Sequence, residues 1–365
     1  MKIGLLTFHR AENFGAVLQC FALQHFLTRK GYDVQIVDYR NPSIEHQYDI
    51  FSPWVFSQYR SLYVGLCIYI KRFYDIKSRL RKKILYSQFR DQYFHKTRVY
   101  RQIDNPLHFD AIIVGSDQVW NLNLCKGGEQ VYFLDFPVLK YTKKIAYAAS
   151  SELNSFELLR NNKDKIRKLL SSFDNISVRE KQLQEELKDY INQKIEVCID
   201  PTFLESQEFY RSIAIEPKEK DYILVYHLTE NSEATCLAES IAKEKNKKIV
   251  EIHAGFVRTK DKRRHKDSLG PKELLGYILN AEIIITTSFH GMALSLIFNK
   301  QFVVMRTPTV TRMQNLLSAV ELNDRIIDTA KGYYKLNPID YGKVNMNLER
   351  EIEKSKSFLI KSLKE

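Results

Sequence analysis

The sequence has few of the residues that cross-link or interrupt a chain. Its five cysteines are scattered over 365 residues, and no two of them have Cys-x-x-Cys spacing. An odd number of scattered cysteines indicates reduced, buried thiols and argues against a disulfide framework or a zinc site. With only 13 Gly and 9 Pro, the composition excludes collagen-like and low-complexity disordered chains.

Long apolar runs are also absent. No stretch reaches the roughly 18 apolar residues that a membrane-spanning helix needs. The apolar run that begins at Met1 turns polar at His9, which is too short for a signal peptide. Together with the reduced cysteines, this predicts a cytoplasmic protein.

The remaining sequence is typical of a packed α/β protein. It is 44% hydrophobic and 27% charged, and its length favours two domains over one. Short apolar runs alternate with segments of helical periodicity, which predicts parallel sheets. We expect strands at 3–8, 34–37, 111–114, 145–149, 176–178, 197–199, 222–226, 248–252, 283–286 and 302–305. We expect helices at 14–27, 156–171, 232–246, 271–280, from about 291, and at 347–363.

The predicted domains are two Rossmann-like units that face each other across a cleft. The first comprises residues 1–205, with a helical insertion at 55–100, and the second comprises residues 206–345. The helix at 346–365 is expected to return to the first domain. Two open α/β units of this kind place a ligand beyond the carboxyl ends of their strands.

The positive charge is concentrated in one segment. The formal net charge is +12, and residues 60–98 contain eleven Lys or Arg against Asp75 and Asp91. Aromatic and aliphatic residues recur there at steps of three and four, which predicts amphipathic helices. Residues 55–98 would therefore bind an anionic membrane surface; the alternative is that the apolar face packs on the first domain. Nucleic acid is not expected, because the aromatic residues lie on a helix face and not on a β-sheet platform.

The sharpest local motif follows the apolar run Ile283–Thr286. A turn of small residues leads through Ser288, Phe289, His290 and Gly291 into a helix. Such a helix start attracts an anion, phosphate or carboxylate, and His290 is titratable where it could reach that anion. The alternative is a histidine that caps its own loop.

Two further motifs follow predicted strands. Arg179 comes directly after Ile176–Val178, where its guanidinium suits a carboxylate or phosphate; a structural salt bridge is the equal alternative. Asp117 follows a buried strand and Gly115, where it could act as acid, base or hydroxyl acceptor, or serve with Ser116 as a helix cap.

The first loop, His9 to Ala16, lies where a Rossmann phosphate loop would be. It lacks Gly-x-Gly-x-x-Gly, so the dinucleotide interpretation is weak. Asn13 is a candidate helix cap.

Taken together, these segments resemble the polysaccharide pyruvyl transferase family of bacterial cell-surface polysaccharide synthesis. The matching stretches run in order along the chain: 7–9, 13–19, 114–121, 144–150, 176–180, 200–202 and 286–291. The resemblance implies a fold like that of GT-B glycosyltransferases, phosphoenolpyruvate as donor, and a pyruvate ketal on a sugar as product. It implies no cofactor and no metal.

The resemblance also assigns residues. Arg179 would bind the donor, together with Ser288, Phe289, His290 and Gly291. Some members have an arginine where this chain has Ser288, so Arg306, Arg312 or the basic loop 258–267 would replace it.

For the chemistry we expect His290 as the acid or a phosphate clamp, and Asp117 as a base. Asn13, His9 and Asp117 would contact the acceptor. An acceptor of this kind is often linked to polyprenyl diphosphate, which would place the enzyme at the inner face of the cell membrane.

Two other functions remain open at this point. A GT-B glycosyltransferase using a nucleotide sugar is compatible with the same fold, since fold does not fix function. A non-enzymatic protein that binds anionic surfaces through the basic segment is the third hypothesis.

Overall fold

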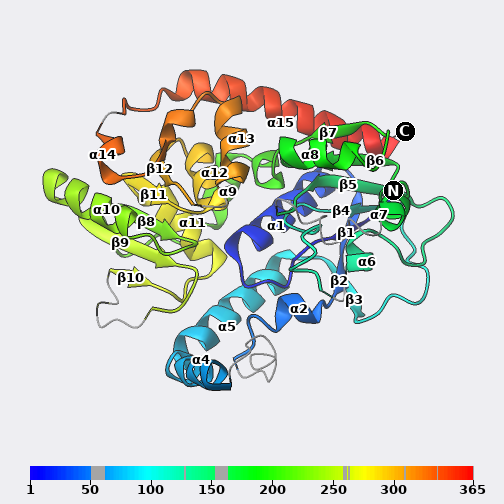
Figure 1. Cartoon of the computed structure of the whole chain (residues 1–365), viewed down its shortest axis with the longest axis horizontal. Helices are drawn as coiled ribbons and strands as arrows, with labels where there is room; N and C mark the ends of the chain where they lie inside the picture. The colour runs from blue at the N-terminus through cyan, green and yellow to red at the C-terminus, as the bar shows by residue number, and fades with distance from the viewer. Residues whose placement is uncertain are drawn as a thin grey trace. The chain divides into compact units, whose positions relative to one another are not determined.

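The computed structural model describes residues 1–50, 62–126, 129–152, 163–257, 261, 264–307, 310–334 and 336–364. The chain forms two compact units (Figure 1). Unit 1 comprises Met1–Trp54, Arg90–Leu204 and Arg350–Glu365. Unit 2 comprises Val55–Phe89 and Glu205–Glu349.

Unit 1 contains a seven-stranded sheet in the order β3-β2-β1-β4-β5-β6-β7, and each neighbouring pair is parallel. The strands are β1 (Lys2–Leu6), β2 (Asp33–Tyr39), β3 (Lys96–Tyr100), β4 (Ala111–Val114), β5 (Lys143–Ala149), β6 (Asn175–Val178) and β7 (Ile195–Val197). The helices are α1 (Phe14–Arg29), α2 (Pro42–Glu45), α6 (Glu129–Tyr132), α7 (Lys163–Leu170), α8 (Lys181–Lys188) and the 3-10 helix η2 (Pro201–Leu204).

Unit 2 contains a six-stranded sheet in the order β10-β9-β8-β11-β12-β13, again parallel throughout. The strands are β8 (Tyr222–His227), β9 (Lys248–His253), β10 (His265–Lys266), β11 (Ile283–Thr286), β12 (Gln301–Met305) and β13 (Ile326–Ile327). The helices are α4 (Leu62–Tyr74), α9 (Gln207–Ile213), α10 (Ser232–Lys245), α11 (Pro271–Asn280), α12 (Phe289–Ile297), α13 (Thr311–Ala319), the 3-10 helix η3 (Asn323–Arg325) and α14 (Ala330–Tyr333). Two helices run from one unit into the other along the chain: α5 (Ile76–Tyr93) and α15 (Tyr341–Lys364).

The two sheets have equivalent strand orders. In each, the first strand in sequence lies between the second and the fourth, which is the order of a Rossmann fold. The sequence-based prediction of two Rossmann-like α/β units is therefore confirmed. In such sheets ligands bind beyond the carboxyl ends where the order reverses, here between β1 and β4 and between β8 and β11.

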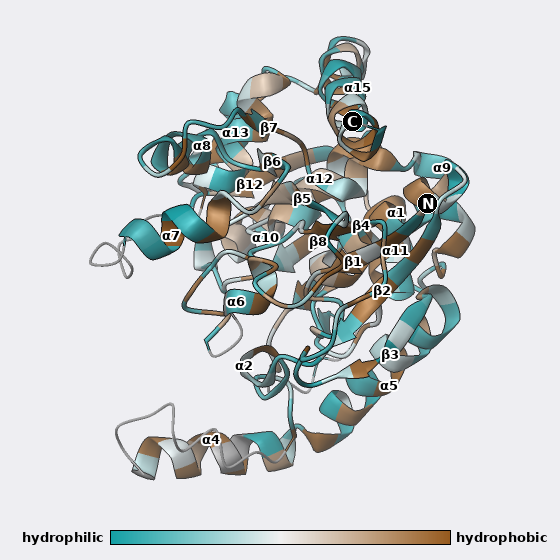
Figure 2. Cartoon of the chain, turned by 90° about the vertical axis from the view of Figure 1, so that its right-hand side faces the viewer, coloured by the Kyte–Doolittle hydropathy of each residue, from teal (hydrophilic) through white to brown (hydrophobic). Residues whose placement is uncertain are grey.

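The predicted strands follow the apolar runs closely. β4 and β11 have the expected bounds, and their residues are all buried; in Figure 2 the central strands β1, β4 and β8 are coloured as hydrophobic. β7 ends at Val197, two residues earlier than expected, and Pro201 begins η2. The helix expected at 156–171 lies partly outside the described residues, and α7 covers 163–170.

The insertion expected at 55–100 differs from the structure in two respects. Two helices are present, but residues 96–100 form β3 of the first sheet. Residues 55–89 group with unit 2, not with the N-terminal domain. The reason is local packing of α5: the Arg79 guanidinium lies 4.1 Å from the Phe256 ring centroid, and Arg81 Nη2 lies 2.9 Å from Glu273 Oε1.

In the part of the chain that the structure describes, no helix combines the length and the apolar character needed to cross a bilayer.

The last three turns of α15 pack on the rest of unit 1. Ser355 is fully buried, and its Oγ accepts a 3.0 Å hydrogen bond from the Ile199 backbone N–H. The Phe358 ring lies against Tyr147, with 6.4 Å between centroids. These contacts fix the backbone just after β7, where the chain turns toward Asp200.

Ser355→Ala should lower the free energy of unfolding of unit 1 by about 1–3 kcal/mol, because the buried Ile199 N–H loses its acceptor. Trp120 is fully buried in unit 1, so tryptophan fluorescence in a urea titration measures this loss. Ser357→Ala, on an exposed position of the same helix, should leave the midpoint unchanged. Equal midpoints for the two variants would contradict the proposed docking of α15.

Candidate functional site

The turn after β4 holds an unusual backbone in unit 1. Gly115 has φ of +111°, and a Cβ there would lie 2.3 Å from the Tyr147 carbonyl oxygen, so only glycine fits. The Gly115–Ser116 peptide bond is cis, and Asp117 has φ of 70°. The Asp117 carbonyl accepts from Ser150 N–H at 3.0 Å, which ties this turn to the end of β5.

Asp117 itself is partly exposed. Its Oδ1 accepts from the Gln118 N–H at 2.8 Å, so the carboxylate orients its own turn. The position remains at the carboxyl end of β4, beside the strand-order reversal between β1 and β4.

Arg179, directly after β6, lies inside a hydrogen-bonded network. It is only 6% exposed, and each guanidinium nitrogen donates to a different side-chain oxygen. Nε donates to Glu180 Oε1 at 3.0 Å, Nη1 to Asp200 Oδ2 at 2.8 Å, and Nη2 to Ser150 Oγ at 2.9 Å.

The surrounding groups are themselves fixed. Ser150 Oγ donates to Glu180 Oε1 at 2.8 Å, and Asp200 Oδ1 accepts from the Thr202 N–H at 3.0 Å. Burial alone would lower the pKa of Arg179, but the neighbouring carboxylates of Glu180 and Asp200 raise it above its usual value. In this structure Arg179 therefore makes the structural salt bridge that the sequence analysis left as its alternative.

His9 is buried, with 1% exposure. Its Nδ1 lies 3.1 Å from the Thr7 carbonyl oxygen and its Nε2 lies 2.9 Å from Asp38 Oδ1. Burial would raise the pKa of Asp38, but hydrogen bonds from His9 and Arg10 outweigh it and lower that pKa well below its usual range. His9 was expected to contact the acceptor. In the structure both of its ring nitrogens already lie within hydrogen-bond distance of oxygen atoms of Thr7 and Asp38.

Asn13, the other expected acceptor contact, caps α1. Its Oδ1 accepts from the Gly15 N–H at 2.9 Å and from the Ala16 N–H at 3.3 Å. The cap explains the asparagine without a ligand.

In unit 2, the turn after β11 is built around a close approach of α12 to the sheet. Ser288 caps α12, its Oγ accepting from the Gly291 N–H at 3.3 Å, and its N–H donates to Thr286 Oγ1 at 2.9 Å. A Cβ on Gly291 would lie 2.4 Å from Thr286 Oγ1 and 2.7 Å from Tyr226 Cδ1. Gly291 is therefore required for packing.

Burial raises the pKa of Tyr226 to about 12, and its hydrogen bond with Ser288 opposes this rise. Tyr226 is thus a neutral hydroxyl under the N-terminus of α12.

His290 lies in the first turn of α12 and is partly exposed. Its ring meets the Phe289 ring edge to face, with centroids 5.1 Å apart. Phe289 is buried, so it anchors the turn while His290 lies nearer the surface.

Arg306, Arg312 and the basic loop 258–267 are the candidates to replace the arginine that some family members have at the position of Ser288. Arg306 follows β12, the strand beside β11, and its Nε lies 2.6 Å from Asp328 Oδ1 in an exposed pair. Arg312 lies in α13. In the basic loop, 258–260, 262 and 263 lie outside the described residues, whereas Arg264 and Lys266 pair with Glu251 and Glu219. Of these candidates, Arg306 is the one that directly follows a strand paired with β11.

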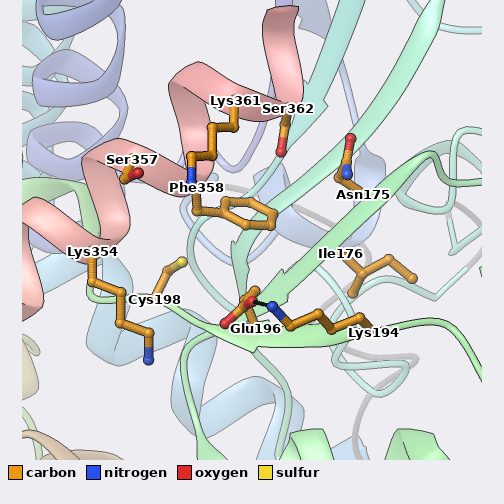
Figure 3. Close-up of a pocket in the computed structure, with 10 residues that line it drawn as sticks. All are labelled: Asn175, Ile176, Lys194, Glu196, Cys198, Lys354, Ser357, Phe358, Lys361 and Ser362. Carbon is orange, nitrogen blue, oxygen red and sulfur yellow. Dashed lines mark ion pairs between the residues drawn. The ribbon is translucent and has the colours of Figure 1, made fainter. Parts of the chain in front are cut away.

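A pocket of about 410 Å³ also lies in unit 1, between α15 and the strands β6 and β7 (Figure 3). Lys194 and Glu196 form an ion pair at its edge. Its lining residues are Asn175, Ile176, Lys194, Glu196, Cys198, Lys354, Ser357, Phe358, Lys361 and Ser362. None of these is an expected site residue, so this pocket lies outside the candidate site.

The partners that fix these side chains were not predicted from the sequence. Glu180 and Asp200 lie in the matching stretches 176–180 and 200–202 without an assigned role, and Asp38 lies outside those stretches. Asp38 closes the ion pair with Arg10 at 2.5 Å and could have been found from its place at the end of a predicted strand.

Arg179→Ala should lower the stability of unit 1 by about 3–5 kcal/mol, because it leaves two buried carboxylates without their cation. The control is Lys188→Ala, which removes an exposed i,i+3 pair with Glu185 and should cost less than about 1 kcal/mol. Differential scanning calorimetry measures both. An Arg179→Ala protein as stable as the wild type would show that the network is not structural.

Similar solved structures include UDP-GlcNAc 2-epimerases from Neisseria meningitidis and Rickettsia bellii, with 10% and 12% identity and TM-scores of 0.46 and 0.48. They cover 99% and 100% of this chain, and the chain covers 94% and 97% of theirs. The spinosyn rhamnosyltransferase SpnG has 12% identity and a TM-score of 0.44, with coverage of 100% of this chain and 99% of its own.

At these identities and TM-scores the similarity carries no conclusion about activity. No curated protein sequence matches the chain. The model of the polysaccharide pyruvyl transferase family matches residues 13–307, which include every matching stretch except 7–9. The chain belongs to the polysaccharide pyruvyl transferase family.

Proposed function

We propose that the protein transfers the pyruvyl group of phosphoenolpyruvate onto two hydroxyls of a sugar in an oligosaccharide or polysaccharide. The observation that carries this proposal is the turn after β11, where a helix N-terminus and a partly exposed His290 lie together at the carboxyl edge of the second sheet. Family membership makes the donor and the product the most specific hypothesis.

The reaction requires one proton to be added and two to be removed. The methylene carbon of phosphoenolpyruvate takes a proton and becomes the methyl group, while one sugar hydroxyl adds to the central carbon. The second hydroxyl then displaces phosphate, as the bond from carbon to the phosphate oxygen breaks. Of the two hydroxyl protons, one is matched by the proton that the methylene carbon gains, and the other leaves with phosphate.

The anion is assigned to the start of α12. The first N–H groups of a helix have no acceptor within the helix, and the helix dipole favours negative charge there. Ser288, Phe289 and Gly291 fix this turn, as described above. His290 then protonates the methylene carbon or holds the phosphate, and Arg306, which follows the strand paired with β11, is assigned as the accompanying cation.

In unit 1, Asp117 is assigned as the base that takes a hydroxyl proton, since its carboxylate is partly exposed at the strand-order reversal. Arg179 is assigned to the donor by resemblance. Each of its three guanidinium nitrogens already donates to Glu180, Asp200 or Ser150, so we expect it to act on the donor mainly through the network that it holds together.

We assign the acceptor sugar to a membrane surface, which the protein would contact through α4. Among the described side chains of this helix, six large apolar ones are exposed: Tyr63 (75%), Val64 (40%), Leu66 (51%), Ile70 (48%), Phe73 (62%) and Tyr74 (69%). Figure 2 shows hydrophobic and hydrophilic residues alternating along α4. An exposed apolar face beside basic residues favours an anionic lipid interface, where a polyprenyl-diphosphate-linked sugar would be found.

His290→Ala and His290→Gln should each lower turnover by at least about a hundredfold, the usual contribution of a positioned acid or base. The measurement is phosphate release from phosphoenolpyruvate with a panel of lipid-linked oligosaccharides. His108→Ala, which removes an exposed histidine of unit 1, should be unaffected.

A Gln variant that keeps activity while the Ala variant loses it would indicate hydrogen bonding in place of proton transfer. Near-normal turnover of both would remove His290 from the mechanism. Thermal stabilisation of the wild type by nucleotide sugars, and not by phosphoenolpyruvate, would favour a glycosyltransferase.

The wild-type protein should co-sediment with anionic vesicles at low salt, and rising salt should weaken this binding. Combining Ile70→Ser, Phe73→Ser and Lys77→Glu should release it, because it removes exposed apolar area and one cation from α4 and α5. The control combines Lys163→Glu and Lys165→Glu on α7. It changes the net charge by more than the first variant does, yet it should still sediment with the vesicles. If both variants sediment like the wild type, or if the wild type never binds, the membrane assignment is wrong.

A further inference from the structure

Three histidines and two glutamates gather at one edge of the sheet in unit 2. His227 is the last residue of β8, His253 is the last residue of β9, and His265 is the first residue of β10. Glu230 lies in the loop after β8, and Glu251 lies two residues before His253 on β9. The parallel pairing of these strands brings them together.

The carboxylate of Glu251 fixes one nitrogen of His227. His227 Nε2 lies 3.1 Å from Glu251 Oε2, and Glu251 also accepts from Arg264 Nε at 2.6 Å and from Thr235 Oγ1 at 3.3 Å. Because Glu251 can only accept here, Nε2 carries the proton and the lone pair of neutral His227 lies on Nδ1.

That lone pair has nothing to bind within the described residues. His227 is 99% buried, and its Nδ1 has no hydrogen-bond partner there. Buried polar atoms are nearly always satisfied, so this nitrogen indicates a ligand.

His253 is held in a similar way. Its ring is stacked on that of His227, with 5.0 Å between centroids and 14° between planes. Its Nδ1 lies 2.8 Å from Glu230 Oε1, and its Nε2 lies 3.0 Å from His265 Nδ1. If Nε2 donates to His265, then Nδ1 is available beside Glu230.

We propose that unit 2 binds a divalent transition-metal ion of the zinc class through His227, Glu230 and His253. One potential ligand atom from each of these residues lies within 4.8 Å of the others. Two imidazoles and one carboxylate are a common zinc ligand set that leaves a fourth position open. Glu251 and His265 hold the second nitrogens of the two histidines, as outer partners of metal-bound histidines do.

A second ligand set is geometrically available, namely Glu251, His253 and His265. It would require Glu251 to exchange its bonds to Arg264 and Thr235 for the metal. The first set leaves those bonds in place and satisfies His227 Nδ1, so the structure favours it.

The site adjoins the turn assigned to the donor. β8 pairs with β11, and the Leu228 N–H next to His227 donates to Thr287 Oγ1 at 2.9 Å. A metal ion would therefore add positive charge on the same sheet edge as His290. Metal binding itself does not depend on the proposed transfer reaction.

The test uses the full-length protein without a histidine tag, stripped with a chelator and then dialysed against buffer. Zinc is added, and bound metal per chain is measured by mass spectrometry after desalting, with affinity measured by competition against a chromophoric chelator. We expect one zinc ion per chain and a rise in the melting temperature of the stripped protein.

Glu230→Gln should weaken zinc binding by at least about tenfold, since even outer partners of a ligand contribute 10–100-fold. Glu230 is exposed, so this variant should fold normally. Glu244→Gln, which removes an exposed carboxylate near the far end of α10, should bind like the wild type. His227→Gln, checked for folding by circular dichroism, should also lose binding.

X-ray absorption should show nitrogen and oxygen neighbours with imidazole scattering. A sulfur neighbour would assign the zinc to an exposed cysteine and overturn the proposal. It would equally be overturned by wild-type protein that retains no zinc, or by equal affinities of the wild type and Glu230→Gln. None of these outcomes bears on phosphate release from phosphoenolpyruvate, so the proposed function is tested separately.

Discussion

Parallel strand pairing is the constraint on which both candidate sites depend. When all strands of a sheet run in one direction, every carboxyl end meets at the same edge. The polar residues of interest follow strands within a few residues: Asp117 after β4, Ser150 after β5, Arg179 after β6, and the Ser288–His290 turn after β11. Their sequence separations are large, yet hydrogen bonding between neighbouring strands brings them to a common edge within each unit.

That same constraint explains why the fold could be read from the sequence. β4 and β11 are uniform apolar runs buried on both faces, and such runs stand out in any sequence. β3, by contrast, is an edge strand with the sequence Lys-Thr-Arg-Val-Tyr, in which apolar and polar residues alternate little. The predicted helical insertion therefore included these residues. β13 has two residues and leaves no periodic pattern. The assignment of 55–89 to unit 2 rests on contacts with residues about 175–190 positions later, which no local pattern contains.

The sites were predictable to a lesser degree. The Ser288–Gly291 turn was identified because strand, small residues and helix follow one another directly in sequence. For Arg179 the sequence left two hypotheses equal, and no local pattern shows its partners, because Asp200 lies 21 residues away and Ser150 lies 29 residues away. The histidine cluster escaped notice for the same reason. His227 and His253 lie 26 residues apart on neighbouring strands, so they match no metal motif with fixed spacing.

The basic segment shows why a count of charges is a weak guide to a partner. Several of its cations serve the fold: Arg81 pairs with Glu273, and buried Lys82 donates to the Ala254 carbonyl at 3.2 Å. A cation that is bound internally adds little to the attraction of a distant anionic surface. The exposed aromatic and aliphatic residues of α4 remain largely accessible. If this segment binds lipid, burial of apolar area should therefore supply most of the free energy, and part of the binding should survive salt concentrations that screen the remaining charges.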